Sequence, residues 1–215
     1  YIDGGIGMSK EENVVKYYAI CNRLKNVIRK GWKLWNVQRD RIESVAEHIF
    51  STQMLAIAMK HEYQYDVDIM NVVFMLAIHE LGEAIIDDLT QFEINENDKE
   101  KIEHAAVHEI LSGILDGKQI EELFLEFDSH STKEAFFAYQ CDKLECDLQS
   151  KIYDEEGCVD LTKQDGNFVM NNSIVKLDNG ESWSTMWLKY GQEMYPYDDN
   201  FKAVSNYAIK NKIKK

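Results

Sequence analysis

The stretch MLAIHELGEAIIDDLT, residues 75–90, is the most apolar part of this chain, and yet it carries charged side chains. His79, Glu80 and Glu83 interrupt it, and Asp88 lies near its end. Burying an unpaired charge costs several kcal/mol, so a charged side chain in a buried helix is either paired or bound to a metal ion. The stretch therefore predicts a helix at the centre of the fold that carries a polar cluster.

Helical periodicity extends outward from this stretch over most of the chain. Apolar residues recur at three- and four-residue spacings, which is typical of amphipathic helices, and Pro196 is the one proline in the sequence. The residues around 67–86 are apolar nearly all round, so that helix is expected to be buried among the others. We predict an all-α bundle with helices over about residues 11–30, 44–59, 67–86, 96–115, 119–128, 131–153, 181–194 and 199–212.

Three helix starts carry capping signals. Ser44 and Glu47 form the S-x-x-E pattern of a capping box, and Ser131 and Glu134 form a second one. Asn97 is the expected cap of the helix that begins near it.

The chain divides into three predicted parts. Residues 1–7, YIDGGIG, are expected to be a remnant that precedes a native start at Met8, residues 8–153 form the bundle, and residues 154–215 form an extension that packs on the same domain. Turn signals at QDGN, MNNS and LDNG favour a small hairpin from NFVM and SIVKL within this extension. Aromatic side chains supply its apolar docking area, namely Trp183, Trp187 and Tyr190.

Composition excludes several classes of partner. A formal net charge of −14 opposes binding to a nucleic-acid polymer or an anionic membrane. The longest apolar run, Val72–Ile78, is shorter than the ~20 residues that cross a bilayer, and no signal peptide precedes Met8. None of the cysteines forms a CxxC pair, which favours reduced thiols and a cytoplasmic location; they are Cys21, Cys141, Cys146 and Cys158.

Polar residues on three predicted helices can form one metal site. On a regular helix, His79, Glu80 and Glu83 project toward one flank. His48 lies on the apolar stripe of the helix over 44–59, and Asp142 borders that of the helix over 131–153. Imidazole nitrogens and carboxylate oxygens from these helices would enclose a divalent ion and leave positions for water.

Each residue also has an ordinary structural interpretation. A lone core histidine such as His48 often bonds a backbone carbonyl, and Asp142 is equally compatible with an ion pair to Lys143 or Lys151. The residues 79–83 are compatible with an internal hydrogen-bonded cluster. Taken jointly, these interpretations need a separate reason for each residue, which favours the metal site.

Two known metal motifs do not fit. HELGE resembles the H-E-x-x-H motif of zinc proteases, but Glu83 stands where the second histidine would be. Ferritin-like bundles need Glu-x-x-His pairs on two helices, and no suitable pairs occur. His104 and His108, spaced i and i+4, are capable of binding a metal, but they lie on an acidic helix and are expected to be partly exposed.

With these residues assembled, residues 16–153 resemble the HD-domain superfamily, and within it the branch of 5′-nucleotidases that hydrolyse deoxyribonucleoside 5′-monophosphates. Three ordered segments carry the resemblance: IRKGWKLWNVQRDRIESVAEH, LAIHELGEAIIDDLT and FAYQCDKLECDLQ. The sequence departs from the family in two places. The eponymous aspartate is Glu80, and Lys30 and Gly31 separate Arg29 from Trp32.

The resemblance implies a role for each site residue. The metal ligands would be His48, His79, Glu80 and Asp142, and they would hold one divalent ion of Mn, Co, Mg, Fe or Zn. Glu83 and Asp88 would be catalytic, and the substrate-binding residues would be Arg29, Trp32 and Asp88.

The resemblance also implies the substrate and two alternatives. It predicts a phosphohydrolase that takes a small nucleotide, and a homodimer. One alternative is a metal-binding HD protein whose catalysis has drifted because of Glu80. The other is a dinuclear phosphodiesterase or oxygenase that recruits His104, His108 or His130 to a second ion.

Overall fold

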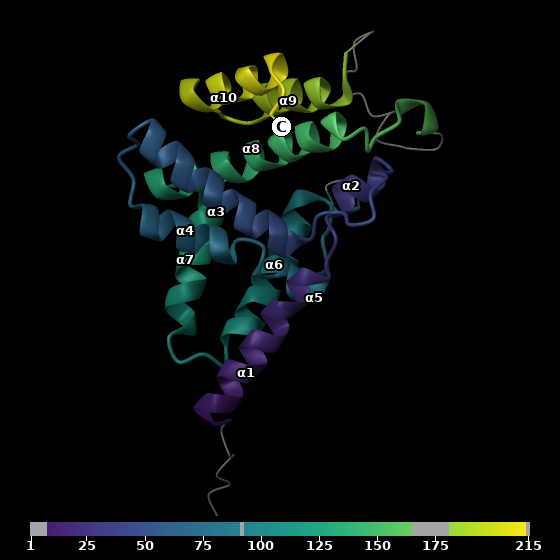
Figure 1. Cartoon of the computed structure of the whole chain (residues 1–215). Coiled ribbons are helices and arrows are strands. Elements are labelled where there is room, and N and C mark those ends of the chain that lie inside the picture. The colour runs from purple at the N-terminus through teal and green to yellow at the C-terminus, as the bar shows by residue number, and fades with distance from the viewer. Residues whose placement is uncertain (1–7, 91–92, 165–180, 214–215) are drawn as a thin grey trace, which may run out of the picture.

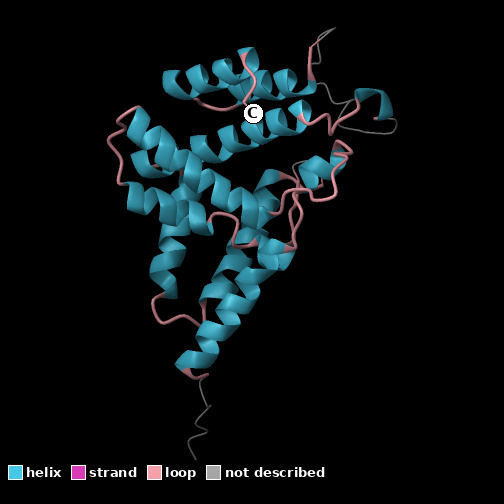
Figure 2. Cartoon of the chain, in the orientation of Figure 1, coloured by secondary structure: helices cyan, strands magenta, loops and turns pink. Residues whose placement is uncertain are grey.

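The computed structural model describes residues 8–90, 93–164 and 181–213. Its described part is all-α, as predicted (Figure 2). The β-pairing in this part is limited to an isolated antiparallel bridge between Ile28 and Ser44. In chain order the elements are α1 (Lys10–Cys21), η1 (Asn22–Lys25), α2 (Lys30–Leu34), α3 (Val45–Glu62), α4 (Ile69–Ile78), α5 (Glu83–Ile86), α6 (Glu96–Leu111), α7 (Gly117–Ser129), α8 (Lys133–Glu155), η2 (Leu161–Lys163), α9 (Trp183–Met194) and α10 (Asp199–Lys210).

Helix α8 lies between two helical layers. It contacts α3 and α4 on one side and α9 and α10 on the other (Figure 1). The apolar residues of α4 fill the centre, with Val72, Met75 and Leu76 fully buried. Since burial of such side chains is the main favourable term in folding, α4 anchors the bundle.

The predicted helix over 67–86 is wrong in its extent. Helix α4 ends at Ile78, and a turn follows in which backbone bonds tighten to the i−3 carbonyl, as from the Leu81 amide to the Ile78 oxygen at 3.0 Å. At Gly82 the backbone of α6 comes so close that a Cβ would lie 3.2 Å from the Glu103 carbonyl oxygen. The packing of α6 against this turn explains why the regular helix does not continue.

The predicted helix over 11–30 is also too long. Helix α1 ends at Cys21, and the chain becomes extended after η1. There it pairs briefly with the segment before α3: the Arg29 amide donates to the Glu43 oxygen at 3.1 Å, and the Val45 amide donates to the Val27 oxygen at 2.8 Å. This pairing places Arg29 next to the bundle centre.

One of the three predicted caps is confirmed. Ser44 and Glu47 form both bonds of a capping box at the start of α3. The cap of α6 is Asn95 rather than Asn97, and the cap of α8 is Thr132. The predicted box at Ser131 is therefore wrong, because Thr132 takes the capping position and the Glu134 carboxylate accepts a bond from the Asp68 amide instead.

The extension packs on the bundle through aromatic side chains. Trp183 is 1% exposed and lies with Trp32, Trp35 and Tyr153 in one apolar cluster. The predicted hairpin and residues 1–7 lie outside the described residues. The domain boundaries at 8–153 and 154–215 stay a prediction.

One segment, Ile69–Ile86, has the length and apolar composition of a membrane-crossing helix. Half of that segment is buried in the fold, and it includes the turn between α4 and α5. A core helix has the same composition, so the segment is weak support for membrane insertion.

Candidate metal and phosphate site

Four predicted metal ligands meet at the centre of the bundle. His48 lies on α3, His79 and Glu80 follow α4 directly, and Asp142 lies on α8. One ligating atom from each residue lies within 4.8 Å of the other three. The structure thus brings together residues that are up to 94 positions apart.

The ligating atoms surround a common point. Asp142 Oδ1 lies 3.0 Å from His48 Nε2 and 3.6 Å from His79 Nε2. Glu80 Oε1 lies 3.9 Å and 3.8 Å from the same two nitrogens. Two imidazoles and two carboxylates suit a divalent ion such as Mn, Fe, Co or Zn.

Outer contacts orient both imidazole rings. His48 Nδ1 lies 2.6 Å from Glu145 Oε2, and His79 Nδ1 lies 2.8 Å from the Leu76 carbonyl oxygen, to which it donates. Both contacts leave Nε2 facing the cluster, as outer-shell partners of metal-bound histidines do. His79 Nε2 is buried and has no hydrogen-bond partner in the described part of the chain, as expected of an atom built to bind an ion.

The carboxylates of the cluster are ionised. Burial opposes the charge of Glu80, but His79, Arg29 and Lys99 outweigh it and lower the pKa of Glu80 to about 2. Burial likewise opposes the charge of Asp142, whose pKa is nevertheless held well below its usual range by Lys143, His48 and His79. The donor set therefore carries the negative charge that a divalent ion neutralises.

Metal affinity is expected to rise with pH. Burial and Arg29 favour neutral His48, but Glu145 and Asp142 outweigh them and raise the pKa of His48 to about 9 in the metal-free protein. Below that pH a bound metal must displace a proton from this imidazole.

We expect the affinity for Mn²⁺ to rise about tenfold per pH unit from about pH 7 to 8.5, where one proton is released, and to level off above pH 9. Calorimetric titration in buffers of different ionisation enthalpy measures both the affinity and the proton release. An affinity that does not change over this range would contradict the assignment of His48.

Glu83 is a buried carboxyl beside the cluster. It is 1% exposed, and neither oxygen has a hydrogen-bond partner among the described residues. Burial, with Glu80 and Asp88 nearby, raises the pKa of Glu83 well above its usual value. A carboxyl of this kind is suited to accept and return a proton.

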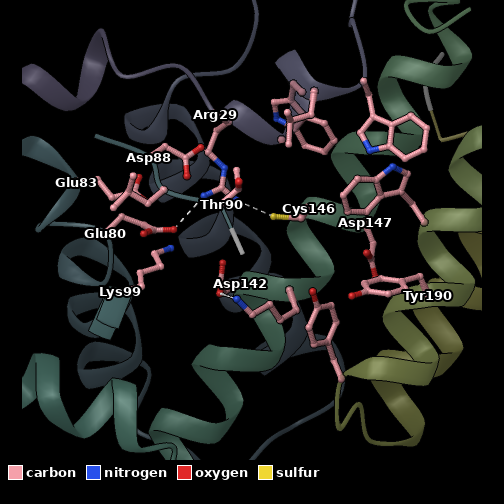
Figure 3. Close-up of a pocket in the computed structure, with 18 of the residues that line it drawn as sticks. Arg29, Glu80, Glu83, Asp88, Thr90, Lys99, Asp142, Cys146, Asp147 and Tyr190 are labelled. Atoms are coloured by element: carbon pink, nitrogen blue, oxygen red, sulfur yellow. Dashed lines mark hydrogen bonds and ion pairs between the residues drawn. The ribbon is translucent and has the colours of Figure 1, made fainter. Parts of the chain in front are cut away.

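A cavity of about 270 Å³ opens beside the cluster. Glu80, Glu83 and Asp88 lie at one end of it, and Asp147 and Tyr190 lie at the other (Figure 3). Its other lining residues are Arg29, Gly31, Trp32, Leu34, Trp35, Leu89, Thr90, Lys99, Asp142, Lys143, Cys146, Met186, Trp187 and Tyr195.

Arg29 borders both the cluster and the cavity. Its Nη1 donates to Glu80 Oε1 at 3.0 Å, and its Nη2 lies 3.0 Å from the Cys146 sulfur (Figure 3). Asp88 lies on the same wall, where its Oδ2 accepts the Lys30 amide hydrogen at 2.5 Å. Two of the three predicted substrate residues, Arg29 and Asp88, therefore line the cavity next to the cluster.

Trp32 lines the cavity, but most of its side chain packs in the core. It is 3% exposed, its indole N–H donates to Glu43 Oε2 at 2.7 Å, and its ring packs edge-on against Tyr153 at 5.3 Å. Only a small part of this ring is available to a substrate.

A family model described as HD domain matches residues 21–182. The chain belongs to the HD-domain family. The 5′-deoxynucleotidase HDDC2 of Dictyostelium discoideum is 31% identical over 153 residues, which cover 67% of this chain and 79% of that protein. The human 5′-deoxynucleotidase HDDC2 is 28% identical over 146 residues, which cover 66% of this chain and 69% of that protein.

Solved structures share the fold of this HD domain. A protein from Pyrococcus horikoshii superposes with a TM-score of 0.64 at 21% identity, covering 91% of this chain and 98% of that one. A protein from Magnetospirillum magnetotacticum, described as a predicted metal-dependent phosphohydrolase, superposes with a TM-score of 0.61 at 18% identity, covering 94% and 92% of the two chains. At these identities the likeness concerns the fold alone.

Several residues of the HD-domain site were not predicted. Lys99, from α6, is one of them and lines the cavity beside Glu80, whereas the pair of Lys143 with Asp142 Oδ2 at 2.8 Å is one of the two ion pairs considered from the sequence. Glu145 orients His48, and its position three residues after Asp142 on the same helix is a signal that could have found it. Nothing in the local sequence distinguishes Lys99 from other surface lysines.

The histidines considered for a second ion lie apart from the four-ligand cluster. His104 pairs with Asp128 at 2.8 Å, and His108 lies 3.1 Å from Glu121. The ring of His130 packs on Tyr139, with centroids 3.8 Å apart. None of the three belongs to the group formed by His48 and its neighbours, and His104 instead forms a separate group with Glu100 and Asp128. An ion held by His104 would therefore lie outside the four-residue cluster, which disfavours a dinuclear centre.

Proposed function

We propose that this HD domain removes the 5′-phosphate from nucleoside monophosphates, with one divalent ion held by four ligands. These ligands are His48, His79, Glu80 and Asp142. The observation that carries the proposal is that one ligating atom of each residue lies within 4.8 Å of the others. This cluster borders a cavity that is also lined by Arg29, Glu83 and Asp88. Relatives named 5′-deoxynucleotidase support the substrate class. The Magnetospirillum protein, whose fold this chain shares, is described as metal-dependent.

Glutamate at position 80 is compatible with this site. Although its side chain is one methylene longer than aspartate, Oε1 stays within 3.9 Å of both imidazole Nε2 atoms. The same oxygen accepts the Arg29 hydrogen bond at 3.0 Å, so this arginine holds the carboxylate in place. The geometry supports ligation by Glu80 and weighs against the drifted, non-catalytic alternative.

Each residue around the cluster would have a separate role in the reaction. A divalent ion would polarise a phosphoryl oxygen and lower the pKa of a water molecule. Glu83 would take the proton of the attacking water, which its buried and unpartnered carboxyl can hold. Asp88 would orient the sugar or the water at the mouth of the cavity, and Trp32 would bound the sugar side.

Phosphate release from a substrate panel tests the proposal. The panel compares 5′-monophosphates of deoxyribose and ribose nucleosides with a nucleoside 3′-monophosphate and a phosphodiester. We expect release from 5′-monophosphates, with the deoxy sugar preferred. Activity confined to the phosphodiester would favour the dinuclear alternative, and bound metal without any release would favour the non-catalytic one.

Replacing Arg29 should weaken transition-state stabilisation. The Arg29 guanidinium donates to Glu80 and lines the cavity, so we propose that it neutralises charge on the phosphoryl group. We expect Arg29→Gln to lower kcat/KM by about 100-fold or more, because loss of one donor to a developing oxyanion typically costs 10²–10³ in rate. Steady-state phosphate release measures this effect, and Arg39→Gln, which removes an exposed arginine paired with Glu156, is the matched control. Equal activity of Arg29→Gln and the control would exclude this role.

Two further predictions are a homodimer, which follows from the family resemblance, and a cytoplasmic location, which follows from the cysteines. A homodimer is supported by exposed apolar side chains on α3 and α4, among them Phe50, Met54 and Phe74. Light scattering on the eluting protein would determine the oligomeric state. A cytoplasmic location is the other prediction, and the free cysteines are compatible with it.

A further inference from the structure

The cavity end away from the metal cluster is aromatic. Three of the four tryptophans of the chain line the cavity, namely Trp32, Trp35 and Trp187, and Trp183 packs against them. Ring centroids are 5.7 Å apart for Trp32 and Trp187, 6.5 Å for Trp35 and Trp187, and 6.0 Å for Trp183 and Trp187. Trp32, Trp35 and Trp183 are buried, whereas Trp187 is partly exposed and lines the cavity. An exposed aromatic ring such as that of Trp187 holds flat heterocycles by stacking. If the phosphate lies at the metal cluster, the nucleoside half of the substrate lies against this wall.

One acidic side chain, Asp147, lies at this aromatic end (Figure 3). It is 1% exposed, and its Oδ2 accepts the Tyr197 hydroxyl hydrogen at 2.9 Å. Within the described part of the chain this is the one hydrogen bond of the carboxyl group, so Oδ1 is left for a ligand. The site described above assigns no role to Asp147.

The Asp147 carboxyl is held in place by the extension. A Cβ at Gly191 of α9 would overlap Oδ2 and lie 2.8 Å from Cγ, so the carboxyl packs directly on the α9 backbone. Tyr197, which follows α9, holds Oδ2 on another side. A buried group fixed between two partners is preorganised for a ligand and loses little conformational freedom on binding.

The spacing along α8 matches a nucleotide. Asp142 and Asp147 are five residues apart, which corresponds to about 7.5 Å along a helix axis at 1.5 Å per residue. Cys146 and Lys143 line the same wall between them. A substrate with its phosphate near Asp142 therefore extends its sugar and base toward Asp147.

The protonation state of Asp147 suits recognition of a base. Burial raises the pKa of Asp147 well above its usual value, although Tyr197 and Lys143 oppose the shift. A neutral carboxyl offers both a donor and an acceptor, whereas an ionised carboxylate only accepts. The edges of nucleobases carry donors and acceptors side by side, so Oδ1 can bond a base whether it donates or accepts.

We propose that Asp147 is a specificity-determining residue that hydrogen-bonds the base of the nucleotide through Oδ1. This inference rests on the proposed function, and it adds the recognition of the base. It also gives the extension a role, because Gly191 and Tyr197 position the carboxyl.

A comparison of substrates with and without a base tests the inference. The substrates are dAMP, dCMP, dGMP, dTMP and 2-deoxyribose 5-phosphate, and the enzymes are the wild type, Asp147→Ala and Asp147→Asn. We expect Asp147→Ala to lower kcat/KM at least about tenfold for one or more nucleotides and less than about twofold for the sugar phosphate. Asp147→Asn, which keeps a donor and an acceptor, should retain most of the activity. An equal loss on all substrates, or an unchanged profile, would overturn the inference.

Binding of a nucleoside without phosphate separates this inference from the proposed function. Because three of the four tryptophans line the cavity, quenching of tryptophan fluorescence by 2′-deoxyadenosine reports its binding without turnover. We expect Asp147→Ala to weaken this binding about tenfold or more, while Gln149→Ala, a change on the same helix outside this cavity, leaves it unchanged. Asp147-dependent binding in a protein that releases no phosphate would uphold the inference and overturn the proposed function. If nucleotides release phosphate but the wild type and Asp147→Ala bind the nucleoside equally well, the proposed function is upheld and the inference is overturned.

Discussion

Replacement of His79 by alanine is expected to abolish metal retention and phosphate release together. The His79 Nε2 atom is buried without a hydrogen-bond partner in the described residues and lies 3.6 Å from Asp142 Oδ1, so its loss removes one side of the cluster. Outer-shell partners of metal ligands already contribute 10–100-fold to affinity or activity, and loss of a direct ligand should therefore cost more than about 100-fold. Elemental analysis after gel filtration measures retained metal, and a phosphate assay on the same sample measures turnover.

A second histidine provides the matched control for this experiment. His104 lies on α6, is partly exposed and pairs with Asp128 at 2.8 Å, outside the four-ligand group. We expect His104→Ala to keep the wild-type metal content and rate. Full metal stoichiometry in His79→Ala would contradict the assigned site, and loss of metal in His104→Ala would point to a second ion.

Replacement of Glu83 by glutamine is expected to separate catalysis from metal binding. Glutamine has the size of glutamate but cannot take the proton of the attacking water, and Glu83 is not among the four ligands. General acid–base catalysis contributes typically 10²–10⁴-fold, so we expect kcat to fall by about that factor. The metal content and the binding of a nucleotide should stay close to those of the wild type.

Glu103→Gln is the control for the change in charge. Glu103 lies in the same acidic group as Glu80 and Glu83, but it pairs with Lys99 at 3.3 Å and does not line the cavity. We expect it to change kcat only a few-fold. If Glu83→Gln kept full kcat, the proton acceptor would have to be another group; if it lost metal instead, Glu83 would be a ligand.

The positions of the helices follow largely from local sequence, whereas their ends depend on tertiary contacts. The apolar stripe that includes Val45, His48 and Met59 is buried as predicted, because its spacing follows the helical period. The break after Ile78 has no proline or local turn signal, and it reflects the approach of α6 at Gly82. At α8 the neighbouring Ser131 and Thr132 are both good caps, so the choice between them was not determined by the sequence.

The candidate site shows the same division. The metal cluster could be predicted because a buried charge requires a partner, and the structure brings the four predicted residues together. Lys99 and Asp147 could not be predicted, because tertiary packing brings them to the cavity. Lys99 lines it because α6 packs on the turn after α4, and Asp147 lines it because α9 packs on α8. That the four residues bind an ion stays a prediction.

The most direct test of the central claim is a metal titration of phosphate release. The protein is stripped with a chelator, one divalent metal at a time is added back in known amounts, and release from a deoxyribonucleoside 5′-monophosphate is followed. We expect no release from stripped protein and a linear recovery that saturates at one ion per chain. Undiminished release by the metal-free protein, or no release at any metal content from protein that binds the ion, would contradict it.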